Sequence, residues 1–162
     1  MKLMKITITM LLSMAMLSSC KTTYIKKFHK EAKKEVGTAK IRLKKDTVRV
    51  VYPEISMFDF NKDEIKPEAK TSLTGLGVIL KKYDKIDFII NGYTDNVGTD
   101  DVNQSLSQRR ADAAKSLFES NGVSGGRMQT NGKGAASPIE PNTTEEGKAA
   151  NRRVELLLYE RK

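Results

Sequence analysis

Residues 92–98 read GYTDNVG, and residues 103–111 read NQSLSQRRA. A short apolar run, Ile86 to Ile90, precedes the first stretch, and the second opens a helix-forming segment over Asn103 to Ser120. Glycine at both ends of 92–98 favours a turn. The pattern therefore predicts a buried strand, a turn that carries Asp95, and then a helix.

Arg110 falls on the apolar face of this predicted helix. At about 100° per residue it lies close to Leu106, Ala114 and Leu117, whereas charged side chains gather on the opposite face. Arginine is almost never buried without a partner, so Arg110 needs an anion. That anion comes either from the protein, with Asp95 as the candidate, or from a ligand.

The rest of the chain supplies alternating strands and helices. Lys66-Pro67-Glu68 starts a helix, with proline in its first turn and an acid near its N-terminus. The strands are expected at Thr47 to Tyr52, Ile55 to Phe60, Ile86 to Ile90, Arg127 to Gly134 and Arg153 to Tyr159, and a last short helix after Thr143-Thr144-Glu145-Glu146. The order β-β-α-β-α-β-α-β predicts an α+β fold, a two-layer αβ sandwich with helices packed on one mixed sheet.

The N-terminus has the pattern of an export signal. Lys2 and Lys5 are followed by an apolar run over 6–17 that is too short to span a membrane. Small residues then precede Cys20, the only cysteine, as in the lipobox of bacterial lipoproteins. We expect a lipoprotein signal peptide over 1–19 and lipidation of Cys20, with an ordinary cleaved signal as the alternative.

Positive charge concentrates between the signal and the predicted domain. Residues 21–45 hold ten Lys or Arg against two acids, so their excess is 10 − 2 = +8. Cleavage before Cys20 would remove two lysines, and the chain's formal charge would fall from +9 to +7. We expect a basic tether over 20–46 and a domain over 47–162. The tether is either simply solvated or attracted to anionic lipid headgroups or wall polymers.

Four short motifs, in order, resemble the OmpA-like domain family. They are Phe58-Asp59-Phe60-Asn61, Gly92-Tyr93-Thr94-Asp95 with Gly98, Asn103-x-x-Leu106-Ser107-x-x-Arg110-Ala111, and Asn151-Arg152-Arg153-Val154-Glu155. The resemblance covers roughly residues 47–160. With Cys20 as a lipid anchor, the chain looks like the family's lipoprotein form, the peptidoglycan-associated lipoproteins.

This resemblance implies a binding site for the meso-diaminopimelate of the peptidoglycan stem peptide. Asp95 would accept the side-chain ammonium and Arg110 would bind the side-chain carboxylate. Asn61 and Asn103 would add hydrogen bonds, and at least one of Arg152 and Arg153 would join the site. Thr94 and Gly98 would shape the turn.

The resemblance implies an outer-membrane, lipid-anchored protein with its domain in the periplasm, bound non-covalently to peptidoglycan. The alternative is an accessory subunit of an envelope secretion or motor complex, with envelope proteins as partners. No nucleophile, carboxylate pair or metal set is legible, so we expect neither an enzyme nor a cofactor. Metal sites of the Cys/His kind are excluded because His29 is the single histidine. Nucleic-acid binding lacks a motif and conflicts with export.

Overall fold

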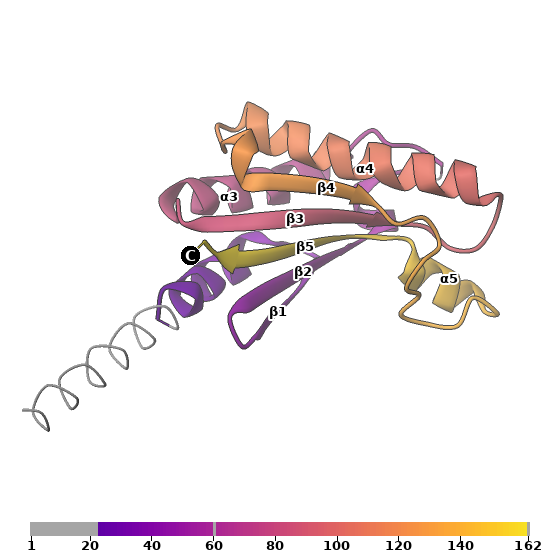
Figure 1. Cartoon of the computed structure of the whole chain (residues 1–162), viewed down its shortest axis with the longest axis horizontal. Helices are drawn as coiled ribbons and strands as arrows, with labels where there is room; N and C mark the ends of the chain where they lie inside the picture. Colours follow the sequence, from indigo (N-terminus) through magenta and orange to yellow (C-terminus); the bar gives the residue numbers. More distant parts are fainter. Residues whose placement is uncertain (1–22, 60, 162) are drawn as a thin grey trace, which may run out of the picture.

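The computed structural model describes residues 23–59 and 61–161. A five-stranded sheet has the order β1-β2-β5-β3-β4, and β3 and β4 form its single parallel pair (Figure 1). The strands are β1 (Lys40–Lys44), β2 (Thr47–Pro53), β3 (Ile86–Tyr93), β4 (Met128–Gly132) and β5 (Arg153–Glu160). The helices are α2 (Glu54–Met57), α3 (Pro67–Lys82), α4 (Asp100–Ser120), the 3-10 turn η1 (Gly125–Arg127) and α5 (Glu145–Asn151), besides an N-terminal helix over 23–35.

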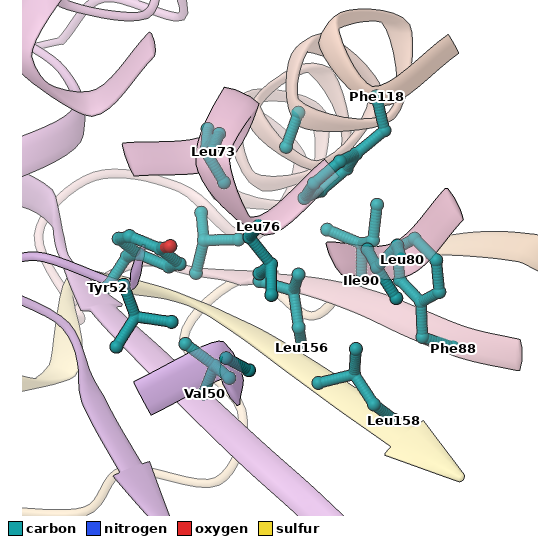
Figure 2. Close-up of a cluster of buried hydrophobic side chains, with 14 of the residues drawn as sticks. Val50, Tyr52, Leu73, Leu76, Leu80, Phe88, Ile90, Phe118, Leu156 and Leu158 are labelled. Carbon is teal, nitrogen blue, oxygen red and sulfur yellow. The ribbon is translucent and has the colours of Figure 1, made fainter. Parts of the chain in front are cut away.

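The core lies between one face of the sheet and the helices. Alternate residues of β2, β3 and β5 point to this face, among them Val50, Phe88 and Leu156, and all three are fully buried. Leu76 of α3 and Phe118 of α4 meet them there (Figure 2). The α+β sandwich with helices on one mixed sheet is therefore confirmed.

The start of α3 and the end of α4 lie where the sequence predicts. Proline stands at the first position of α3, and Glu68 lies in its first turn. α4 begins three residues before the predicted Asn103, because the Thr99 side chain caps it by accepting from the backbone N–H of Val102. It ends at Ser120 with Asn121 as its C-cap, and Gly122 follows with a φ of 83°.

The strand predicted over 55–60 is wrong, because the chain forms the short helix α2 there. Pro53 ends β2, and the N–H of Phe58 donates to the carbonyl of Glu54 at 2.8 Å, closing one helical turn. Met57 and Phe58 are both buried, whereas Ile55 is 82% exposed. A strand would send neighbouring side chains to opposite faces, so it could not bury these two together.

Residues 23–45 differ from the solvated tether that their charge favours. The N-terminal helix buries Ile25, Phe28 and Ala32 in the main core, and Val36 follows them. β1, a strand that the sequence did not predict, then pairs with β2 in a hairpin. The boundary expected at residue 47 thus falls inside this hairpin. A count of charges along this segment does not reveal that its apolar residues recur at helical spacing.

The predicted signal peptide over 1–19 and the predicted lipid-bearing Cys20 lie outside the described residues. Within 23–59 and 61–161, the structure contains no helix both long and apolar enough to cross a membrane.

Candidate functional site

Four segments meet at the end of the sheet where β3 stops and β5 starts (Figure 1). They are α2 with the loop that follows it, the loop between β3 and α4, the first three turns of α4, and α5 with its junction to β5. Together they enclose a cleft of about 450 Å³. Its walls are formed by Glu54, Asn61, Thr94, Asp95, Val97, Gly98, Val102, Asn103, Leu106, Arg110, Glu145, Lys148 and Arg152.

Arg110 is 1% exposed and has the anionic partner that its position demands. That partner is Glu54, whose Oε1 accepts from Nη2 of Arg110. Nε of Arg110 donates to the carbonyl oxygen of Lys62 at 2.9 Å, and the guanidinium lies 5.1 Å from the centre of the Phe58 ring. The internal pair of Arg110 with Asp95, one of the two alternatives that the sequence left open, is absent from the ion pairs of the described residues.

Asp95 is instead paired with Arg152. Its Oδ1 accepts from the N–H of Val97 at 3.0 Å, which folds the turn, and its Oδ2 accepts from Nη1 of Arg152 at 2.6 Å. Nε of Arg152 donates to Oε2 of Glu54. Although burial alone would lower it, these bonds to Asp95 and Glu54 raise the pKa of Arg152 above its ordinary value.

Arg110, Glu54, Arg152 and Asp95 therefore form a chain of alternating charge along the cleft wall. We call these four residues the charge chain. Its two ends are Arg110 and Asp95, the two residues that the sequence singles out. The cleft lining as a whole holds three acids and three cations, so its formal charge is zero.

The two asparagines expected in the site both line the cleft. Asn103 is 5% exposed, and its Nδ2 donates to the carbonyl of Val97 at 3.0 Å, so it holds the β3–α4 loop against α4. Asn61 is exposed and has a φ of 58°, a left-handed conformation that asparagine adopts more readily than most residues.

Thr94 and Gly98, the two residues predicted to shape the turn, both lie in the loop between β3 and α4. Gly98 has a φ of 95°, which a residue with a side chain rarely adopts. Thr94 is 4% exposed, and its backbone N–H donates to the carbonyl of Gly134 at 2.9 Å. Within the described ranges its buried Oγ1 has no hydrogen-bond partner.

Arg153 points away from the cleft, so of the two consecutive arginines only Arg152 lines it. Arg153 stacks on Tyr93 at 3.8 Å and donates from Nε to Glu155 at 2.6 Å. Arg49 also donates to Glu155. Although burial alone would raise it, the bonds from Arg49 and Arg153 hold the pKa of Glu155 below its ordinary value.

Sequence reasoning missed three charged residues of the cleft. Glu54 lies 56 positions from Arg110, and its one signal was an acid directly after the proline that ends a strand. Glu145 and Lys148, which bond each other at 2.9 Å, come from α5. The capping motif located α5 correctly, since the side chain of Thr144 accepts from the N–H of Gly147, but it did not show that α5 borders the site.

The arrangement favours binding over catalysis. Every carboxylate of the charge chain is held by a guanidinium, so none is poised as a free base or nucleophile. Across 23–59 and 61–161 the structure also brings together no group of three His, Cys, Asp or Glu residues fit to hold a metal ion.

Comparisons with known proteins agree with this site and fold. Residues 57–152 match the model of the OmpA family. The probable lipoprotein YiaD of Escherichia coli is 42% identical over 113 residues, which are 70% of this chain and 52% of YiaD. The outer-membrane lipoprotein YfiB of Pseudomonas aeruginosa is 31% identical over 102 residues, 63% of this chain and 61% of YfiB. The chain thus spans little more than half the length of these relatives.

Solved structures show the same fold. A MotB-like protein from Desulfovibrio vulgaris superposes with a TM-score of 0.81 over 90% of this chain and 99% of its own, at 23% identity. The peptidoglycan-associated lipoprotein of Burkholderia pseudomallei gives a TM-score of 0.60 over 70% of this chain and 90% of its own, at 26% identity. With its family model matched over more than half its length and its fold shared with these structures, the chain belongs to the OmpA family.

Proposed function

We propose that this chain is an outer-membrane lipoprotein whose domain binds peptidoglycan non-covalently and tethers the membrane to the cell wall. The ligand is the meso-diaminopimelate of the stem peptide, whose side chain ends in both an ammonium and a carboxylate. The observation that carries the proposal is the charge chain, which offers both signs of charge on one wall of a neutral cleft.

In this proposal, Asp95 accepts the ammonium and Arg110 and Arg152 bind the carboxylate. Ionised Asp95 has about four lone-pair sites, and its bonds to Val97 and Arg152 use two of them. The bonds of Arg110 to Glu54 and Lys62 use two of its five N–H donors. A planar guanidinium can hold both oxygens of a carboxylate at once.

Neutral groups complete the proposed contacts. Asn61, Asn103 and the unpaired hydroxyl of Thr94 border the same cleft. Arg153 has no part in them because it lies outside the cleft lining. The proposal also keeps the export signal over 1–19 and lipidation of Cys20, supported by lipoproteins among the relatives.

The test is calorimetric titration of a chain starting at residue 21 with two muropeptides. One carries meso-diaminopimelate, and the other carries lysine, which keeps the ammonium and lacks the carboxylate. We expect binding of the first and at least tenfold weaker binding of the second, because hydrogen bonds to a charged group contribute about 1.5–3 kcal/mol. Equal binding of both would remove the arginines from recognition and contradict the proposal.

A pair of variants tests whether Asp95 binds the side-chain ammonium of the ligand. Asp95→Asn keeps the shape of the side chain and removes its charge, and we expect at least tenfold weaker binding of the diaminopimelate muropeptide. Asp101→Asn is the matched control, because Asp101 is exposed in the first turn of α4 and lies outside the cleft lining. Both should unfold at the same temperature within a few degrees. Equal loss in the two variants would show a general charge effect instead of a site.

A further inference from the structure

The N-terminal helix presents five lysines on its solvent side. Lys26, Lys27, Lys30, Lys33 and Lys34 are all exposed, and no ion pair joins any of them to a residue in the described ranges. At 3.6 residues per turn they occupy an arc of roughly 120° centred on Lys30. We call these five residues the lysine face.

The two acids of this helix lie outside the lysine face, and the carboxylate of Glu31 is bound by the domain. Glu31 accepts from Nζ of Lys82 at 2.7 Å and from the hydroxyl of Tyr83 at 2.9 Å. These bonds hold the pKa of Glu31 below its ordinary value. Glu35 packs beside Gly75 of α3, and its carbonyl accepts from Ser72. Among the ion pairs of the described residues, none therefore joins a carboxylate to the lysine face.

The direction of the lysine face is fixed by packing. The opposite side of the helix buries Ile25, Phe28 and Ala32 in the core, and the rings of Tyr24 and Phe28 meet Tyr83 edge-to-face at 5.2 and 5.5 Å. The helix cannot rotate about its axis without exposing these side chains, so its lysines always point away from the domain.

The helix begins at the opposite end of the sheet from the cleft. The hydroxyl of Tyr24 accepts from the N–H of Lys85, directly before β3, whereas Asp95 follows the end of β3. Eight strand residues span about 25 Å. Figure 1 shows the N-terminal helix, in indigo, and α5, which borders the cleft, at opposite ends of the molecule.

The chain leaves little room between this helix and the proposed lipid. Cys20 precedes the first described residue, Thr23, by three positions. Three residues reach at most about 10 Å, against about 80 Å for a free tether of 25 residues. A lipid on Cys20 would place the lysine face within reach of the headgroups.

We propose that the lysine face docks on an anionic lipid surface and holds the domain against the membrane with its cleft directed away. Permanent anchoring rests on the proposed lipidation of Cys20, whereas the attraction to anionic lipid and the direction of docking follow from the lysine face and its place opposite the cleft. The lysine face thus orients the domain on the membrane and leaves the cleft accessible to peptidoglycan.

The test measures sedimentation of the chain starting at residue 21 with lipid vesicles. This chain keeps every described helix and strand, and it lacks the lipid that would otherwise dominate binding. We expect it to bind vesicles of three parts phosphatidylethanolamine to one part phosphatidylglycerol at low salt, and not vesicles of phosphatidylethanolamine and phosphatidylcholine. Binding should fall as salt screens the charges.

Two triple variants locate the surface. Changing Lys26, Lys30 and Lys34 to Gln should weaken binding to the anionic vesicles about a hundredfold. The control changes Lys40, Lys44 and Lys70 to Gln, three exposed lysines on β1 and α3. Equal loss in both variants, or greater loss in the control, would overturn the proposal. Muropeptide binding should be unchanged in both, so failure here and failure of the proposed wall binding are read from separate assays.

A fluorescent label on a single introduced cysteine tests the orientation. Without Cys20 the chain has no cysteine, so Lys33→Cys and Asn96→Cys each give a single site, one on the lysine face and one beside the cleft. Nitroxide-labelled lipid headgroups should quench a fluorophore at position 33 and leave one at position 96 bright. Equal quenching at both positions would contradict the docking direction.

Discussion

At the scale of single residues, Arg110 shows how a site can be anticipated while its partner is missed. Helical spacing alone places a cation on the buried face of α4 and so requires an anion. Glu54 supplies it from the junction between two predicted strands, so no local pattern joined the two. Only the fold brings residues 56 positions apart into contact.

We expect Arg110→Met to lower the free energy of unfolding by about 3 kcal/mol, because it leaves the buried carboxylate of Glu54 with one partner fewer. Adding Glu54→Met should recover at least half of that loss. Arg109→Met is the control, since Arg109 pairs with Asp63 on the surface and should contribute less than about 1 kcal/mol. Urea unfolding of the Arg110→Met variant, the double variant and the Arg109→Met control measures these free energies. A cost for Arg110→Met no larger than that of the control would disprove the buried pair.

At the scale of elements, glycines set how closely α4 approaches the sheet, and hence where Arg110 lies. A Cβ on Gly92 of β3 would stand 2.1 Å from the carbonyl oxygen of Ser107 in α4. A Cβ on Gly132 of β4 would stand 2.7 Å from the backbone nitrogen of Gln108. Both glycines come from the sheet edge nearest α4, so the helix rests directly on the backbone of two strands.

We expect Gly92→Ala to lower the free energy of unfolding by about 1–3 kcal/mol, because backbone cannot yield as a flexible side chain can. It should also weaken muropeptide binding, since α4 carries Asn103 and Arg110. Gly126→Ala is the matched control, because the nearest atom to a Cβ there is 3.9 Å away. Chemical denaturation measures the first effect and calorimetry the second. A Gly92→Ala protein as stable as the control would mean that the close approach is absent.

At the scale of the whole molecule, the N-terminal segment is part of the folded unit. The N-terminal helix and Val36 place four buried side chains in the main core, and β1 covers one edge of β2. Three of them, Ile25, Phe28 and Val36, are large, and fully burying each contributes roughly 1.5–3 kcal/mol, a sum comparable with the whole stability of a domain.

A chain starting at residue 46 should therefore lose cooperative thermal unfolding, whereas one starting at residue 21 should keep it. Circular dichroism follows the transition, and binding of a hydrophobic dye reports the exposed core. Should the shorter chain unfold cooperatively at the same midpoint, residues 23–45 would be an appendage after all.

The sequence by itself determined the elements whose signals are local. The helix starts at Pro67 and Thr144, the buried strand before Gly92, and the α+β class all follow from spacing and turn residues within a few positions. Helical spacing put Asn103 and Arg110 on one face of a helix, the family resemblance added Asp95 to them, and all three line the cleft.

Only the tertiary structure decided which groups those residues touch. The pairing of Arg110 with Glu54, the choice of Arg152 over Arg153, and the entry of α5 into the cleft depend on contacts between distant segments. The N-terminal segment followed the same rule, since its charge is a local property and its burial is not. The face of a helix or strand on which a residue lies follows from the spacing of its neighbours along the chain, whereas its contact partner depends on how whole elements pack.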